Sequence, residues 1–156
     1  MKYYLMILGT ILLDQLTKVW IRTNLAISDS IVIIDGLFAI THIENKGAAF
    51  SMLAGRRLFL ILLPLVTVVI ILIAIYIYRK EYHPLLLTSM ALIAGGGIGN
   101  LIDRMYFGVV TDFFDLEYFA IFNVADIFVC VGGFLIAIWA IFIDVKQKGK
   151  KDGIDN

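Results

Sequence analysis

Cysteine and histidine are scarce in this chain of 156 residues, which has one cysteine and two histidines. Because Cys130 has no second cysteine to pair with, intramolecular disulfides and zinc sites built on cysteine are excluded. His42 and His83 lie far apart and no His-Glu-x-x-His motif is present, which argues against a zinc protease. We therefore expect neither a metal nor another cofactor.

An excess of charge of one sign is also missing, because 13 Lys and Arg residues balance 13 Asp and Glu residues. A chain without surplus positive charge has no electrostatic basis for binding nucleic acid. Hydrophobic residues make up 61% of the sequence and the mean hydropathy is +0.93. A soluble domain rarely carries so much apolar surface, so the expected solvent is the lipid bilayer.

Four apolar segments stand out, at about residues 3–21, 58–78, 85–102 and 127–143. Each is close to the ~20 residues that a helix needs to cross the hydrocarbon layer. We predict a membrane α-helical fold with four transmembrane helices in a single domain, residues 1–156, with a polar cytoplasmic tail, residues 144–156. Asp14 and Lys18 interrupt the first segment, which argues against a cleaved signal peptide.

The basic residues indicate how the four spans are oriented. Lys2, the pair Arg79-Lys80 and the lysines of the tail fall on one side of the membrane. The positive-inside rule makes that side cytoplasmic, so we expect both termini in the cytoplasm. Asp112 and Asp126 would then lie at the extracytoplasmic face.

The first connection contains two β-prone runs, residues 31–34 and 37–43, separated by Asp35-Gly36. This arrangement is typical of a β-hairpin, so we predict a small extracytoplasmic sheet between the first two spans. The connection at residues 106–125 is expected to be a loop whose aromatic side chains lie in the membrane interface.

Asp112 and Asp126 carry the strongest functional signal. A carboxylate at the edge of a bilayer is energetically unfavourable, which suggests a function. An aspartic protease requires two carboxyl groups that share one proton. If the fourth helix begins near Asn123, its first turn brings that amide close to Asp126. The structural alternatives are a solvated loop acid at Asp112 and an acid at a helix N-terminus at Asp126.

Asp14 and Lys18 are four residues apart and share one helix face. One interpretation is an ion pair near the outer end of the span, with Lys18 reaching out to water. The other is that the pair orients substrate or braces the site. In both cases the pair should face protein rather than lipid.

The segment 95–104 combines four glycines with polar residues. Glycines in a membrane helix indicate close packing of another helix. Asn100, Asp103 and Arg104 follow at the outer end, and we expect Arg104 to organise the site through Asp103. The alternative is helix packing with a capping salt bridge. The segment Asn45-Lys46-Gly47-Ala48-Ala49-Phe50 is interpreted as a turn leading into the second span, and its small residues would also let a backbone approach closely.

Five motifs in order along the chain resemble those of the lipoprotein signal peptidases (signal peptidase II), from the first span to the fourth. They are Asp14-x-x-Thr17-Lys18, Asn45-x-Gly47-Ala48-Ala49-Phe50, Gly96-x-x-Gly99-Asn100-x-x-Asp103-Arg104, Val110-x-Asp112-Phe113 and Phe122-Asn123-x-Ala125-Asp126.

This resemblance implies a bacterial inner-membrane aspartic endopeptidase. Such enzymes remove the signal peptide of diacylglyceryl-modified prolipoproteins by cutting before the lipidated cysteine, and the cyclic peptide globomycin inhibits them. Asp112 and Asp126 match the catalytic dyad. The residues that match supporting or substrate-binding positions are Asp14, Lys18, Asn45, Gly47, Asn100, Asp103, Arg104 and Asn123. The expected partners are these substrates and membrane lipids, and nothing in the sequence requires more than a monomer.

Two other classes remain as alternatives. An ion or proton carrier would need acids near the middle of the membrane, whereas Asp112 and Asp126 are placed at a span's edge. A structural or adaptor protein would use the polar residues only as packing pairs. The Gly-x-Gly-Asp intramembrane proteases are excluded, because Gly97-x-Gly99 is followed by Asn100.

Overall fold

The computed structural model describes residues 1–47 and 57–144. It contains four long helices: α1 (Lys2–Asn24), α2 (Arg57–Tyr78), α3 (Pro84–Tyr106) and α4 (Val124–Ile138), the last continuing as a π-helix over Trp139–Asp144. All four are long and apolar enough to cross a membrane, which confirms the predicted spans. The predicted tail beyond residue 144 and the end of the 45–50 motif lie outside the described residues.

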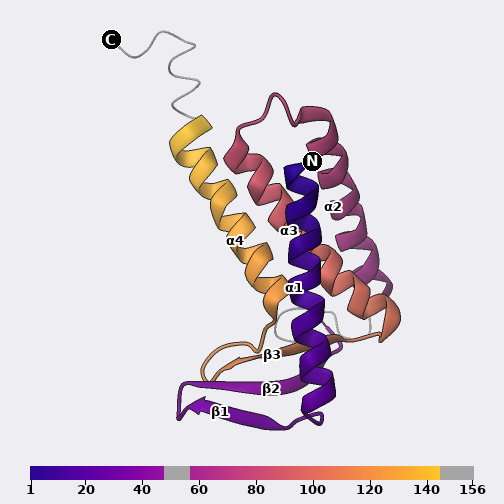
Figure 1. The fold of residues 1–156 in the computed structure, drawn as a ribbon, viewed down its shortest axis with the longest axis vertical. Coiled ribbons are helices and arrows are strands. Elements are labelled where there is room, and N and C mark those ends of the chain that lie inside the picture. Colours follow the sequence, from indigo (N-terminus) through magenta and orange to yellow (C-terminus); the bar gives the residue numbers. More distant parts are fainter. Residues whose placement is uncertain (48–56, 145–156) are drawn as a thin grey trace.

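The helix α3 lies at the centre of the bundle and packs against α1, α2 and α4 (Figure 1). Two of its glycines make this approach possible. A Cβ atom at Gly96 would collide with the carbonyl oxygen of Ala125 in α4, and one at Gly99 would collide with the Asp14 carboxylate in α1. The predicted role of these glycines in close helix packing is therefore confirmed.

The outward surfaces of the helices are apolar. Leu16 of α1 is 66% exposed and Phe134 of α4 is 68% exposed, and similar side chains cover the outside of α2. In water such a surface would be unfavourable, but in lipid it is matched to the surrounding hydrocarbon.

A three-stranded antiparallel sheet lies across one end of the helix bundle (Figure 1). Its strands are β1 (Ser30–Ile34), β2 (Phe38–Asn45) and β3 (Val110–Leu116), in the order β1-β2-β3. The hairpin between β1 and β2 is confirmed, with Gly36 in the left-handed region at φ 67°. The expectation that Asp112 lies in a loop is wrong, because residues 110–116 of this connection form β3, which pairs with the distant β2.

The opposite end of the bundle carries the N-terminus and the connection between α2 and α3, so Lys2, Arg79 and Lys80 lie away from the sheet (Figure 1). The buried apolar residues form two clusters along the bundle. One joins Tyr3, Ile75 and their neighbours from α1, α2 and α3. The other joins Ile21, Phe113 and Val124 near the sheet.

Candidate active site

Asp112 and Asp126 come from different elements that meet where the sheet joins the helices. Asp112 is the third residue of β3 and is 3% exposed. The register of β2 and β3 places Ile43 opposite Asp112 and Asn45 opposite Val110. Asn45 is therefore close enough for its Nδ2 to donate to Asp112 Oδ2 at 2.9 Å.

Asp126 lies in the first turn of α4, which begins as the sequence predicts. Asn123 is the N-cap residue, and its side-chain oxygen accepts a hydrogen bond from the Asp126 backbone N–H at 3.0 Å. In return, Asp126 Oδ2 accepts from the Asn123 backbone N–H at 3.2 Å. This reciprocal capping box fixes the position of the carboxylate at the start of the helix.

Two side-chain amides connect the two carboxylates. Asn123 Nδ2 donates to Asp112 Oδ1 at 2.6 Å and to Asn100 Oδ1 at 3.1 Å. Asn100 Nδ2 donates in turn to Asp126 Oδ1 at 2.8 Å. Asp112, Asn123, Asn100 and Asp126 therefore form one continuous chain of hydrogen bonds. The two amides bind each other, and each of them orients one of the acids.

The environment of Asp112 favours its protonated form. Burial raises the pKa of Asp112 to about 6 from an ordinary value of 3.8, and the nearby charge of Asp126 acts in the same direction. Hydrogen bonds from Asn45 and Asn123 and the charge of Lys18 oppose this rise in the pKa. A carboxyl group that titrates near neutral pH is suited to general acid–base chemistry.

Asn45 is held in turn by the residues that follow it. Its Oδ1 accepts a hydrogen bond from the Gly47 backbone N–H at 2.9 Å. Arg104 Nη2 donates to the Gly47 carbonyl oxygen at 3.0 Å. Arg104 of α3 thus reaches the turn that carries Asn45, and through it the neighbourhood of Asp112.

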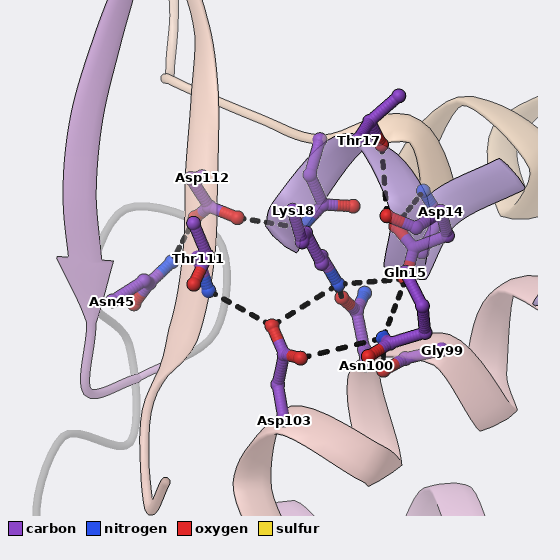
Figure 2. A network of polar contacts seen from close by, with 12 residues as sticks. Asp14, Gln15, Thr17, Lys18, Asn45, Gly99, Asn100, Asp103, Thr111 and Asp112 are labelled. Carbon is purple, nitrogen blue, oxygen red and sulfur yellow. Dashed lines mark hydrogen bonds and ion pairs between the residues drawn. The ribbon is translucent and has the colours of Figure 1, made fainter. Parts of the chain in front are cut away.

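A buried polar cluster from α1 and α3 lies close to Asp112 (Figure 2). Lys18 Nζ is 2.9 Å from Asp14 Oδ2, 3.3 Å from Asp103 Oδ2 and 2.9 Å from Asn100 Oδ1. All three charged side chains are 0% exposed. The alternative in which Lys18 reaches out to water is therefore wrong, because two carboxylates draw its ammonium group inward, and the pair faces protein as predicted.

The same cluster ties α1 to the start of α4. Asp14 Oδ1 accepts a hydrogen bond from the Ala125 backbone N–H at 2.9 Å. Ala125 directly precedes Asp126, so Asp14 fixes the backbone beside the second acid.

Three residues of this cluster, Gln15, Arg22 and Thr111, are not among the site residues that the sequence predicts. Gln15 Nε2 contacts Asp14 Oδ2 at 3.1 Å, the Gly99 carbonyl oxygen at 3.1 Å and Asp103 Oδ1 at 3.3 Å. Arg22 and Thr111 meet at Asp103, which pairs with Arg22 and Lys18. Asp103 makes its ion pairs with α1, and its charge also acts on Arg104, so the expected route from Arg104 through Asp103 stays a prediction. Arg22 could have been found, since it is four residues after Lys18 on the same helix face.

A cavity of about 500 Å³ opens beside the two acids. Asn45, Asn100, Arg104, Asp112 and Asp126 form its polar end. Its remaining wall is mostly apolar and comes from Val110, the segment 119–122 and the first turns of α4, namely Ile127, Val129, Cys130 and Val131. The volume is that of a ligand site, and the lining suits a substrate that is polar at one end and apolar at the other.

Within residues 1–47 and 57–144, the structure contains no group of three or more His, Cys, Asp or Glu side chains arranged to hold a metal ion. Independently of that, two carboxyl groups at the end of a half-apolar cavity are able to give and accept protons.

Comparisons with known proteins agree with this description. The profile of the family described as "Signal peptidase (SPase) II" matches residues 6–142. A lipoprotein signal peptidase of Moorella thermoacetica is 39% identical over 151 residues, covering 97% of this chain and 99% of the relative. One of Streptococcus thermophilus is 41% identical over 136 residues, covering 85% of this chain and 87% of the relative.

Solved structures are also similar. One described as a bacterial membrane enzyme, determined by the in meso method at 2.3 Å resolution, has a TM-score of 0.83 and 31% identity. The match covers 94% of this chain and 91% of that one. A second, described in the same words at 1.9 Å resolution, has a TM-score of 0.76 and 33% identity, covering 92% and 94%.

Proposed function

This chain belongs to the signal peptidase II family of membrane proteases that process prolipoproteins, and we propose that Asp112 and Asp126 are its catalytic dyad. The observation that carries the proposal is the chain of two amides, Asn123 and Asn100, which aligns both carboxylates at the end of one cavity. A dyad needs this fixed geometry, because its two acids must reach the same peptide bond.

In the proposed mechanism one aspartate is ionised and removes a proton from the attacking water. The other is protonated and donates to the carbonyl oxygen of the scissile bond. Close carboxylates do not both ionise easily, and this separates their roles. The raised pKa of Asp112 supports Asp112 as the group that holds the proton before water attacks. The two acids titrate as a coupled pair, so this role describes the resting state of the dyad.

The remaining predicted site residues support the dyad in this proposal. Asn45, with Gly47 and Arg104 behind it, orients Asp112. Asp14, Lys18 and Asp103 are too deeply buried to meet substrate, and they hold the elements that carry the acids. Their proposed role is therefore to brace the site.

The substrate is a diacylglyceryl-modified prolipoprotein, which is part lipid and part peptide, and the proposed cut lies just before the lipidated cysteine. The cavity suits it, since its polar end holds the acids while the apolar face of α4 around Ile127 and Val131 continues toward the lipid-facing surface. Lys2, Arg79 and Lys80 at the end opposite the sheet support cytoplasmic termini and an extracytoplasmic active site. We also propose that globomycin inhibits the enzyme and that a monomer is sufficient for cleavage.

The test is cleavage of a diacylglyceryl-modified prolipoprotein by detergent-purified protein, followed by the gel shift of signal-peptide loss. Asp112→Asn and Asp126→Asn keep the side-chain shape and should abolish cleavage. Asp115→Asn is the matched control, because Asp115 lies on the same strand and accepts a hydrogen bond from Thr41. Cleavage that survives either dyad substitution would reject the aspartic mechanism. Absence of cleavage by folded wild-type protein would favour the carrier or adaptor alternatives.

A further inference from the structure

Arg22 lies in the last turn of α1 and reaches across to the strand that carries Asp112. Its Nη1 donates to Thr111 Oγ1 at 3.0 Å and to Asp103 Oδ1 at 3.3 Å. The guanidinium also lies over the Phe107 ring, 4.5 Å from the ring centroid. These three partners hold the side chain in one orientation, and it is only 20% exposed.

Both the side chain and the backbone of Thr111 form hydrogen bonds to this cluster. The backbone N–H of Thr111 donates to Asp103 Oδ2 at 3.0 Å, as Figure 2 shows. The two oxygens of Asp103 thus connect the side chain of Arg22 to the backbone of Thr111. Because neighbouring residues of a strand point to opposite faces, Thr111 anchors the far side of β3 while Asp112 lines the cavity.

Arg22 also balances the charge of the buried cluster. Two fully buried carboxylates, Asp14 and Asp103, face a single fully buried ammonium group, that of Lys18. Arg22 supplies the second positive charge, on the oxygen of Asp103 that Lys18 does not pair with. Without Arg22, the two buried carboxylates would share the ammonium group of Lys18, which is less favourable than a charge-balanced cluster.

We infer that Arg22 is a positioning residue of this enzyme, which acts through Thr111 and Asp103 to set the place of Asp112 relative to Asp126. The inference rests on the proposed dyad. Arg22 does not line the cavity, so it is not expected to touch substrate. A shift of about 1 Å in a reacting group can cost up to ~100-fold in rate, so this anchor should act on turnover rather than on binding.

The test compares two substitutions that break the hydrogen bond between Arg22 and Thr111, one on each side of the bond. Thr111→Val removes the hydroxyl that Arg22 binds and keeps the side-chain shape. Arg22→Met removes the guanidinium and keeps the apolar length, and Arg22→Lys restores the charge without the forked geometry. The matched controls are Thr23→Val, whose hydroxyl bonds to its own helix at Val19 and Trp20, and Arg79→Met, whose guanidinium stacks on Tyr76.

Cleavage of a diacylglyceryl-modified prolipoprotein peptide is measured for each variant, with kcat and KM determined separately. We expect Thr111→Val and Arg22→Met to lower kcat roughly tenfold, because the loss of one hydrogen bond would raise the activation barrier by the corresponding amount. KM should stay within about twofold, and Arg22→Lys should recover part of kcat. The double variant should lose no more than Arg22→Met alone, because both changes break one connection.

The pH profile separates positioning from simple loss of folded protein. The charged groups that act on Asp112 are Lys18 of α1, Arg104 of α3 and Asp126 of α4. If Asp112 is displaced, its hydrogen bonds to Asn45 and Asn123 become weaker, and these bonds lower its pKa. The fall of activity with rising pH near pH 6 should therefore shift to higher pH in both variants. A smaller folded fraction would lower kcat without moving that limb.

Three results would overturn the inference: kcat and pH profiles like those of the controls, a change confined to KM, or a fall in kcat that only follows the folded fraction. These results leave the dyad intact if Asp112→Asn and Asp126→Asn are inactive. If either of those variants retains cleavage, the proposed dyad fails and the role of Arg22 fails with it.

Discussion

Asn123 performs two tasks with one side chain, and they can be separated by substitution. Its oxygen caps α4 by accepting from the Asp126 backbone N–H. Its amide nitrogen bridges the acids by donating to Asp112 and Asn100. Alanine removes both tasks, whereas serine retains an oxygen that can cap the helix and loses the bridging amide.

Loss of the helix cap should be seen mainly in the free energy of unfolding, whereas loss of the bridging amide should be seen mainly in the rate of cleavage. Loss of an N-cap costs about 1 kcal/mol of folding free energy. Loss of a hydrogen bond to a charged group is worth about 1.5–3 kcal/mol, and each ~1.4 kcal/mol in the barrier is tenfold in rate. We therefore expect kcat to fall roughly 10- to 100-fold in both variants. Both variants also lose the buried amide donor, so the cap is reported by their difference: the free energy of unfolding should fall by about 1 kcal/mol more in Asn123→Ala than in Asn123→Ser.

The assay pairs single-turnover cleavage of the lipidated peptide with denaturant unfolding in the same detergent. Single-turnover conditions report the chemical step apart from product release. Wild-type kcat in Asn123→Ser would show that the amide bridge has no part in catalysis. Equal instability of the two variants would show that the cap does not depend on the side-chain oxygen.

Three further predictions concern the surroundings of the dyad. The pKa of Asp112 is raised to about 6, so a protonated Asp112 acting as the acid gives a kcat/KM that falls as pH rises through that region. Asn45→Ala removes a hydrogen bond that lowers this pKa and should shift the limb upward; an unmoved limb would show that Asp112 is not the titrating group. Gly99→Ala places a methyl group against the Asp14 carboxylate and should lower stability by about 1–3 kcal/mol, measured by thermal unfolding. Gly133→Ala has open space around its Cβ and is the control for that steric effect. Lys18→Met leaves Asp14 and Asp103 without their shared cation and should cost about 3–5 kcal/mol in denaturant unfolding, so a near-normal stability would contradict the balanced cluster.

The features that sequence predicts well here depend on local pattern. Hydrophobic length identifies the four spans, Asp35-Gly36 identifies the hairpin, and Asn123 followed by Asp126 identifies the start of α4. Each of these signals lies within a few residues of the structure that it determines.

The features that were missed depend on contacts between distant segments. β3 reads as a loop because Asp112 and Asp115 interrupt its apolar residues, and its pairing with β2 is not local. The inward direction of Lys18 depends on Asp103, which comes from another helix. Arg22, Gln15 and Thr111 acquire their contacts only when α1 packs against α3 and β3.

The bond between Asp14 and the Ala125 backbone joins the first span of the chain to the last. Segments are synthesised from the N-terminus, so α1 enters the membrane with Asp14 and Lys18 before α3 and α4 exist. The partners that later enclose this pair, Asp103, Asn100 and Ala125, arrive only with those helices. With Asp112 and Asp126 as the proposed dyad, the site is incomplete until α4 has inserted, so we expect activity only after the last helix is in place.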